Sequence, residues 1–202
     1  MLTIYGNTRS RATRCVWALN ELGIDYKRIA LDHVAGENKT PEYLALNPAG
    51  KVPTLVDGDV VMSESLAINL YLARKYDNGL WPSSEADQAR AEQWTIWAAA
   101  EAEPHTVTIA IERMFKPEGA RNEAKAKAAE EALSPRLAYI DAYLKRRDFL
   151  VGDQFGIADL NVACVLASLL VTKVDLGPYP DLTRWLTTTA ARDAHTKARG
   201  LR

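Results

Sequence analysis

The sequence predicts an α/β domain followed by an all-helical domain. Strand and helix signals alternate through the first eighty residues, whereas no strand pattern appears in the remainder of the chain. Between the two parts, the stretch 78–84 is rich in Asn, Gly, Pro and Ser, residues that end regular structure. We therefore expect a first domain over residues 1–80 and a helical domain over residues 84–202.

The composition is that of a globular protein. The 202 residues carry 26 acidic and 25 basic side chains, which gives a net charge of −1, and 48% of the residues are hydrophobic. These values exclude disordered and collagen-like chains. They also lack the basic excess of a nucleic-acid binder, so we expect no nucleic-acid partner.

Cysteine usage and the apolar runs indicate the compartment. Cys15 and Cys164 lie far apart and form no Cys-x-x-Cys pair, which favours a reducing compartment and predicts neither a structural disulfide nor a metal site. The chain opens on a strand-like segment without the layout of a signal peptide. Its longest apolar run, Val162–Val171, is too short to cross a bilayer. We expect a cytoplasmic protein with no membrane partner.

The first domain is predicted to have the element order β-α-β-α-β-β-α. Ser10 can cap a helix that Gly23 stops, and Asp57-Gly58-Asp59 separates two short apolar runs, which is typical of a β-hairpin. The expected strands are Leu2–Tyr5, Tyr26–Leu31, Thr54–Val56 and Val60–Met62, and the expected helices are 10–22, Pro41–Leu46 and Glu64–Tyr76.

The second domain is predicted to consist of helices alone. One helix carries an apolar stripe from Leu133 to Leu144, and Pro135 within it is expected to kink or break it. Ahead of another helix, Gly156 takes the N-cap position and Asp159 can reach back to the cap N–H. The expected helices are 86–114, Asn122–Leu144, Ile157–Val171 and Asp181–Ala194.

Three segments of the first domain have features that suit ligand binding. Val52-Pro53 stands directly before a predicted strand, where a proline is unusual because it cannot donate to the strand ladder. Glu64 and Ser65 open the helix after the hairpin, where free N–H groups and the positive end of the dipole suit a carboxylate. Ser10 lies between the first strand and the first helix, where a hydroxyl can stabilise an anion.

These segments and the order of the elements make the chain resemble the cytosolic glutathione S-transferases, in which a thioredoxin-like domain precedes a helical domain. The resemblance covers nearly the whole chain. It is similar to the serine-type, theta- and delta-like classes because Arg14 follows Ser10 by four residues. It implies that Pro53 is cis and that the unpaired backbone groups of Val52 bind the cysteinyl part of glutathione.

The resemblance also implies a role for each remaining site residue. Glu64 and Ser65 would bind the γ-glutamyl group, while Lys39 and Lys51 would bind the glycine carboxylate. Ser10 would stabilise the glutathione thiolate, which a free thiol with a pKa of about 8.5 seldom forms at pH 7. Tyr5, Thr8 and Asn7 are alternative donors to the thiolate, whereas Cys15 falls one turn too deep in the helix and is expected to be a buried hydrophobe.

The implied activity is that of a glutathione transferase. Such an enzyme activates the glutathione thiolate for attack on a small, apolar electrophile, with glutathione as co-substrate and no metal, and the family is usually homodimeric. Two alternatives remain open. One is a glutathione-dependent isomerase, reductase or dehalogenase on the same fold, and the other is a non-catalytic binding module.

Overall fold

In the computed structural model, which describes residues 1–76 and 78–200, the chain forms two compact units. The first comprises Met1–Trp81 together with the segment from Arg192 onward, and the second comprises Pro82–Ala191. The division after Trp81 falls within the predicted linker, whereas the C-terminal segment packs with the first unit. Residues 201–202 of the expected helical domain lie outside the described residues.

The first unit contains the predicted thioredoxin-like arrangement. Its sheet has the order β2-β1-β3-β4, in which β1 pairs with β2 in parallel and β3 pairs with both β1 and β4 in antiparallel. Each strand lies within two residues of its predicted bounds. The elements are β1 (Thr3–Tyr5), α1 (Ala12–Leu22), β2 (Lys27–Ile29), the 3₁₀ helix η1 (Glu37–Lys39), α2 (Pro41–Leu46), β3 (Thr54–Asp57), β4 (Val60–Ser63), α3 (Ser65–Lys75) and α9 (Asp193–Gly200).

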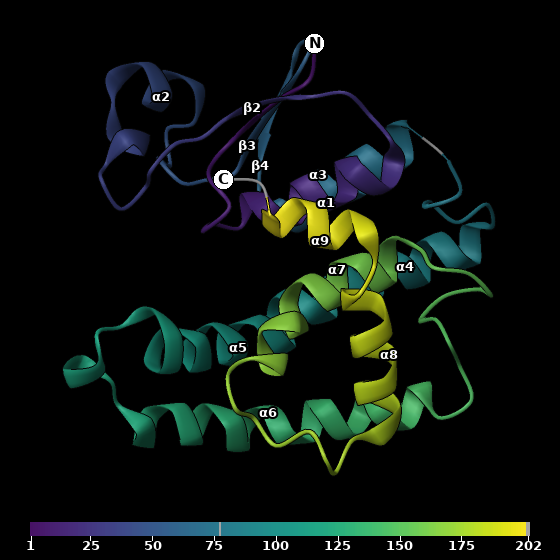
Figure 1. The fold of residues 1–202 in the computed structure, drawn as a ribbon. Coiled ribbons are helices and arrows are strands. Elements are labelled where there is room, and N and C mark those ends of the chain that lie inside the picture. Colours follow the sequence, from purple (N-terminus) through teal and green to yellow (C-terminus); the bar gives the residue numbers. More distant parts are fainter. Residues whose placement is uncertain (77, 201–202) are drawn as a thin grey trace. The chain divides into compact units, whose positions relative to one another are not determined.

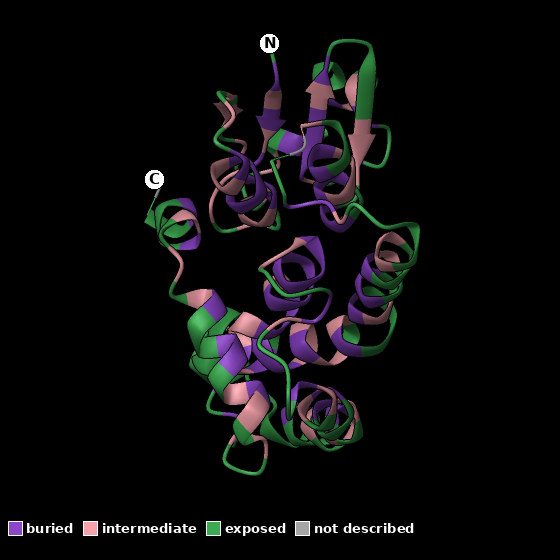
Figure 2. Cartoon of the chain, turned by 90° about the vertical axis from the view of Figure 1, so that its right-hand side faces the viewer, coloured by how far each residue is buried: buried purple, intermediate pink, exposed green. Residues whose placement is uncertain are grey.

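The core of the first unit lies between the sheet and the helices α1 and α3. Figure 1 shows these two helices on one side of the sheet and α2 on the other. Ile4 of β1, Leu55 of β3 and Trp17 of α1 are almost wholly buried. In Figure 2, β3 is coloured mostly as buried, whereas β4 at the edge of the sheet is intermediate to exposed. The sheet therefore provides a rigid platform for the loops at its ends.

Hydrogen bonds to the Asp57 carboxylate connect α3 to the end of β3. Its buried carboxylate accepts hydrogen bonds from Tyr71 at 3.0 Å, from Lys75 at 2.7 Å and from Tyr76 at 2.8 Å. Burial alone would raise the pKa of Asp57, but the bonds from Lys75, Tyr76 and Tyr71 outweigh it and hold the pKa below its ordinary value. The charged form of Asp57 is thus the one that the fold favours.

The second unit is helical throughout its regular elements, as predicted. Its most buried element is α7, of which nearly every residue is inaccessible to solvent. The predicted stripe from Leu133 to Leu144 on α6 is buried too. The elements are α4 (Glu85–Trp97), the π-helical segment η2 (Ala98–Ala102), α5 (Glu103–Ala110), the π-helical segment η3 (Ile111–Phe115), the 3₁₀ helix η4 (Glu118–Ala120), α6 (Glu123–Leu144), α7 (Ile157–Leu166), the 3₁₀ helix η5 (Ala167–Leu170) and α8 (Pro180–Ala190).

The structure differs from expectation at Pro135 and in the predicted helix 181–194. Pro135 does not break α6, because proline and the residue four positions before it, Glu131, are both exposed, so water can satisfy the carbonyl that loses its partner. The predicted helix 181–194 is two helices: α8 ends at Ala190, and α9 begins at Asp193 and runs to Gly200.

Asp159 supports the start of α7 in the way expected. Its carboxylate accepts hydrogen bonds from the Gly156 N–H at 3.1 Å, the Leu150 N–H at 2.9 Å and the Trp185 indole at 2.8 Å. Burial raises the pKa of Asp159 to about 6, although all three donors favour the charged form. Gly156 has no side chain to accept a bond, so only the Asp159 half of a capping box is present.

None of the helices in the described residues combines the length and the apolar character needed to span a membrane.

Candidate active site

The sheet register brings the three motifs of the first unit to one end of the sheet. Tyr5 pairs with Thr54, and Thr54 pairs with Ser63, so these residues form one row across β1, β3 and β4. The chain therefore leaves β1, enters β3 and leaves β4 at the same end. The Ser10 loop, Val52-Pro53 and the pair Glu64-Ser65 follow or precede these positions by only a few residues.

Ser10 lies just ahead of α1 but is not its N-cap as predicted. The N-cap is Arg11, and the helix begins at Ala12. The Ser10 hydroxyl accepts a hydrogen bond from the Ala12 N–H at 3.2 Å and donates one to the Asn7 carbonyl at 2.7 Å. The hydroxyl is partly exposed, and it lies at the positive end of the helix dipole.

Gly6 brings the Ser10 and Val52 segments together. This glycine has φ +129°, and a Cβ on it would lie 3.1 Å from Ser10 Oγ, 3.3 Å from Val52 Cβ and 2.7 Å from Ala12 Cβ. Only a residue without a side chain allows this approach. Gly6 was not among the predicted site residues, although a glycine between a strand and a helix is a signal for close backbone contact.

The backbone ahead of β3 has the geometry that the resemblance implies. The Val52–Pro53 bond is cis. The Lys51 carbonyl accepts bonds from the Tyr43 hydroxyl at 2.6 Å and the Asn47 amide at 2.9 Å, which fixes the chain just before Val52. Burial raises the pKa of Tyr43. Among the described residues, the N–H and C=O of Val52 have no hydrogen-bond partner.

Lys39 contacts the Gly50 carbonyl through its ammonium, and Lys51 is the next residue along the chain. The Lys39 ammonium donates to the Gly50 carbonyl at 2.9 Å, and the Asn38 amide donates to the same oxygen at 2.6 Å. Lys51 is the next residue along the chain and is exposed. Both lysines therefore flank the loop that leads to Val52. Asn38 is buried and holds this loop in place.

Glu64 and Ser65 lie at the N-terminus of α3. Glu64 has φ +71°, in the left-handed region that a residue with a side chain seldom adopts. Such strain persists where the surrounding structure enforces it and is common at ligand sites. Ser65 is buried, and its Oγ accepts a bond from Arg14 Nη1 at 3.4 Å. Arg14 of α1 therefore joins the starts of the two helices.

The alternative thiolate donors differ in position. Tyr5 lies against Tyr43 of α2, with ring centroids 5.8 Å apart. Because side chains alternate along β1 and Ile4 faces the core beneath α1 and α3, Tyr5 faces the opposite side of the sheet. The Asn7 amide oxygen accepts from the Arg9 N–H at 3.1 Å. Cys15 is wholly buried, as expected of a structural cysteine.

A metal centre has no support in the residues that the structure describes, where no group of three or more His, Cys, Asp and Glu side chains has suitable geometry.

The fold and this site define a class of protein in which a thioredoxin-like unit is followed by a helical unit. Comparison with known proteins identifies the family. Residues 1–74 match the family model "Glutathione S-transferase, N-terminal domain", and residues 102–193 match "Glutathione S-transferase, C-terminal domain". The chain belongs to the glutathione S-transferase family.

Individual relatives agree with this assignment. The chain is 34% identical to glutathione S-transferase 3 of Zea mays, over 97% of this chain and 92% of the relative. It is 31% identical to glutathione S-transferase GstB of Escherichia coli, over 98% of this chain and 97% of the relative. Among solved structures, the theta class glutathione S-transferase of Xanthomonas axonopodis pv. citri with glutathione bound is 30% identical, with a TM-score of 0.92 over 100% of this chain and 98% of that chain.

Proposed function

We propose that the chain is a serine-type glutathione transferase in which Ser10 stabilises the glutathione thiolate. The single observation that carries this proposal is at Gly6, where a Cβ would lie 3.1 Å from Ser10 Oγ and 3.3 Å from Val52 Cβ, so that the Ser10 hydroxyl lies close to Val52. A tripeptide paired with Val52 as an added strand would present its cysteine sulfur in this neighbourhood. The similar theta class enzyme of Xanthomonas axonopodis pv. citri, whose structure contains bound glutathione, supports the same ligand.

The remaining site residues match the charged ends of glutathione. The N–H groups at the start of α3, with the Ser65 hydroxyl, suit the γ-glutamyl carboxylate, and the Glu64 carboxylate suits the ammonium. Lys39 and Lys51 suit the glycine carboxylate because both are cations beside the Gly50–Val52 loop. Glutathione is thus the co-substrate in this proposal, and the second substrate is a small electrophile.

Ser10 acts by changing the acceptor of the hydrogen bond that its hydroxyl donates. Without ligand its hydroxyl donates to the Asn7 carbonyl, and in the complex it would rotate to donate to the thiolate. The Ala12 N–H donates a hydrogen bond to the Ser10 oxygen, and Ser10 lies at the positive end of the α1 dipole. Both favour a negative charge on a thiolate beside Ser10. Each unit by which the site lowers the thiol pKa corresponds to about 1.4 kcal/mol.

The test is the pKa of bound glutathione, measured from the ultraviolet absorbance of the thiolate. We expect the wild type to bind glutathione with a thiol pKa roughly 1–2 units below the free value, the effect of one charge-assisted bond and a dipole. In Ser10→Ala the pKa should return toward the free value, and the rate of conjugation at pH 6.5 should fall about tenfold or more.

Matched variants separate the alternative donors. Tyr5→Phe and Thr8→Ala should leave the bound thiol pKa unchanged, because neither removes the Ser10 hydroxyl. A pKa that rises in one of these variants and not in Ser10→Ala would assign the role to that residue. Binding without any shift in the wild type would replace the transferase proposal with the binding-module alternative.

The proposal also includes a homodimer and a reducing, cytoplasmic compartment. Exposed apolar side chains support self-association: Val61 on β4 of the first unit, and Ile96 and Tyr139 on α4 and α6 of the second. Homodimers are usual in the family that the chain resembles. Neither Cys15 nor Cys164 is in a disulfide, which fits the expected cytoplasmic location.

A further inference from the structure

Three buried polar side chains form a hydrogen-bonded network beside the backbone that leads to Val52. Tyr43 belongs to α2, Asn47 directly follows this helix, and Thr54 is the first residue of β3. Each of the three is at most 6% exposed. Because they are buried, the protein itself must supply the partners of their polar groups. The Lys51 carbonyl is one of these partners, and the other partners include members of the network.

The direction of each hydrogen bond in the network can be assigned because a hydroxyl group has a single hydrogen. The Tyr43 hydroxyl donates to the Lys51 carbonyl at 2.6 Å, so it must accept in its 2.8 Å contact with the Thr54 hydroxyl. Thr54 in turn accepts from the Asn47 amide at 3.0 Å. The bonds therefore run in one direction, from Asn47 through Thr54 to Tyr43, and end on the Lys51 carbonyl. The Asn47 amide also donates to this carbonyl directly, at 2.9 Å.

The Lys51 carbonyl belongs to the same peptide group as the Val52 N–H. This peptide group is planar and trans, so its C=O and N–H point in opposite directions. Two donors on the carbonyl oxygen fix the orientation of the group and hence the direction of the N–H. Hydrogen bonds in series also polarise one another, which makes the N–H a stronger donor. The network thus acts, through one peptide group, on an N–H that has no partner among the described residues.

We propose that Tyr43 is a positioning residue for glutathione, which orients and polarises the Val52 N–H through the Lys51 carbonyl. The inference rests on the proposed function, in which the cysteinyl backbone of glutathione pairs with Val52 as an added strand. In such a pair the Val52 N–H donates to the cysteinyl carbonyl of the ligand. The Tyr43 hydroxyl gives its only hydrogen to Lys51, so it should contribute to the affinity for glutathione and not to the chemical step.

Tyr43→Phe tests this role because it removes the hydroxyl and keeps the ring. We expect the Kd for glutathione, measured by calorimetric titration of the full chain, to rise about fivefold, the effect of one lost hydrogen bond. The kcat at saturating glutathione and the pKa of the bound thiol should stay unchanged, because Ser10 keeps its hydroxyl. Thr54→Val removes the preceding bond of the series, so it should raise the Kd in the same direction but less, about twofold.

A second ligand distinguishes positioning of the Val52 N–H from a general loosening of the loop. In the thioamide analogue of glutathione, a sulfur atom replaces the cysteinyl carbonyl oxygen, and sulfur is a weaker hydrogen-bond acceptor than oxygen. The rise in Kd caused by Tyr43→Phe should therefore be at least about twofold smaller for the analogue than for glutathione. An equal rise for both ligands would mean that the hydroxyl only stabilises the loop, and it would overturn the proposal.

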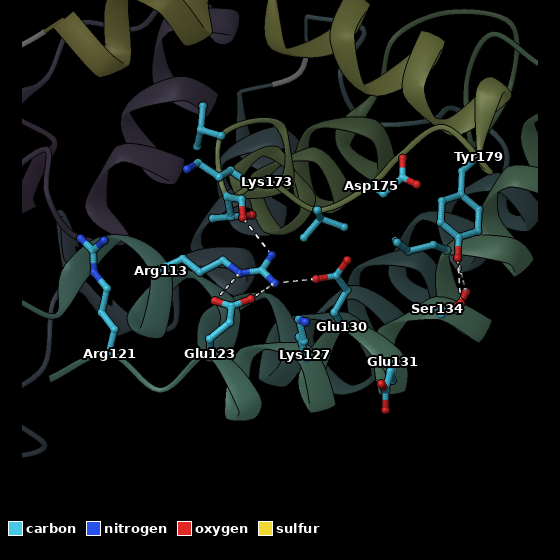
Figure 3. Close-up of a pocket in the computed structure, with 14 residues that line it drawn as sticks. Arg113, Arg121, Glu123, Lys127, Glu130, Glu131, Ser134, Lys173, Asp175 and Tyr179 are labelled. Carbon is cyan, nitrogen blue, oxygen red and sulfur yellow. Dashed lines mark hydrogen bonds and ion pairs between the residues drawn. The ribbon is translucent and has the colours of Figure 1, made fainter. Parts of the chain in front are cut away.

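Tyr179→Phe is the matched control, in the second unit. Figure 3 shows the Tyr179 hydroxyl bonded in the same way as that of Tyr43, to a hydroxyl and to a carbonyl, here both of Ser134, at 2.7 and 3.4 Å. These two residues line a pocket that shares no residue with the glutathione site, so the variant should keep the wild-type Kd.

The possible outcomes separate this inference from the proposed function. A Kd that is unchanged in Tyr43→Phe, or that rises equally in Tyr179→Phe, would overturn the positioning role and leave the proposed function intact. A wild-type chain that does not bind glutathione would overturn the proposed function and the positioning role together. A rise in Kd confined to Tyr43→Phe and Thr54→Val, smaller for the thioamide and without a change in kcat, is the result expected.

Discussion

At the scale of single residues, the site depends on groups that are held by bonds of their own. The Lys51 carbonyl is fixed by Tyr43 and Asn47, and the Gly50 carbonyl by Lys39 and Asn38. These bonds occupy the two consecutive carbonyls that precede Val52 and leave the Val52 backbone available. The loop is therefore arranged before any ligand binds, which lowers the entropy cost of binding.

Gly6→Ala tests whether the approach of Ser10 to Val52 matters. The added methyl group would lie 2.7 Å from Ala12 Cβ and 3.1 Å from Ser10 Oγ, and the φ of +129° is strained for alanine. We expect kcat/KM for conjugation to fall at least about tenfold, and the free energy of unfolding to fall by roughly 1–3 kcal/mol.

Gly23→Ala is the matched control for Gly6→Ala. Gly23 also has a positive φ, +67°, but a Cβ there meets nothing within 4 Å. This variant should lose about 1 kcal/mol of stability and keep its kcat/KM. If Gly6→Ala stays as active as Gly23→Ala, the close approach at Gly6 is not needed for catalysis.

The site residues that sequence could predict are those in local motifs. Ser10, Val52-Pro53 and Glu64-Ser65 each stand next to a strand or a helix end, so neighbouring residues alone indicate them. Tyr43 and Gly6 could not be found this way, because their importance depends on segments that meet only in the folded sheet. Ser10 was also misplaced as the N-cap, since a serine one residue before a cap has the same local signal.

At the scale of elements, the hydrophobic pattern predicted the type of each element more accurately than its bounds. The pattern found every strand and the extent of α6, but it could not show that Pro135 is tolerated, because that depends on the helix face being exposed. Nor does it separate π-helical turns from α-helix, so η2 and η3 were missed within the predicted helix 86–114.

The hydrogen bonds that Asp57 accepts from Tyr71, Lys75 and Tyr76 should make the free energy of unfolding depend on pH. The folded-state pKa of Asp57 lies below its ordinary value, so its contribution is present above about pH 4 and is lost as the pH falls through the folded pKa. Asp57→Asn should destabilise the chain by about 1–2 kcal/mol at pH 7, because Tyr71, Lys75 and Tyr76 lose a charged acceptor. The difference between wild type and variant should shrink as the pH falls below about 4.

Urea unfolding at several pH values measures this difference. Asp159 has a raised pKa and therefore acts with the opposite sign, but it is present in both proteins and cancels in the comparison. Asp59→Asn, on the exposed turn of the same hairpin, is the control and should change stability little. A difference for Asp57→Asn that is constant with pH would contradict the assigned direction of the pKa.

At the scale of the whole molecule, the chain returns to its first unit after completing the second. Helix α9 packs on α1. Just before α9, the Arg192 guanidinium donates two hydrogen bonds, of 2.7 and 2.8 Å, to the Glu21 carboxylate, and the Asn20 amide donates to the Ala194 carbonyl at 3.1 Å. The His195 ring lies against Trp17, with ring centroids 4.3 Å apart. Periodicity cannot reveal this, because it does not show which partner a short helix packs against.

Truncation after Ala191 tests the contribution of α9 to the first unit. Removal of the helix takes away the ion pair with Glu21 and the ring that covers Trp17, which is 1% exposed in the intact chain. We expect the free energy of unfolding to fall by at least about 2 kcal/mol, or roughly 4–8 °C in Tm. The fluorescence of Trp17 should shift to longer wavelength, and the shift should be absent when Trp17→Phe is combined with the truncation.

A shorter truncation supplies the control for this experiment. Removal of residues 199–202 leaves the bonds of Arg192 and Ala194 and the buried side chains of His195 and Ala198, so stability should change little. The segment 192–198 would then account for the effect of the longer truncation, since the bonds of Arg192 and Ala194 and the ring contact of His195 all lie within it. An unchanged Tm and an unchanged Trp17 emission after the longer truncation would mean that α1 and the sheet are stable without α9, and that the C-terminal helix is packed there without supporting the first unit.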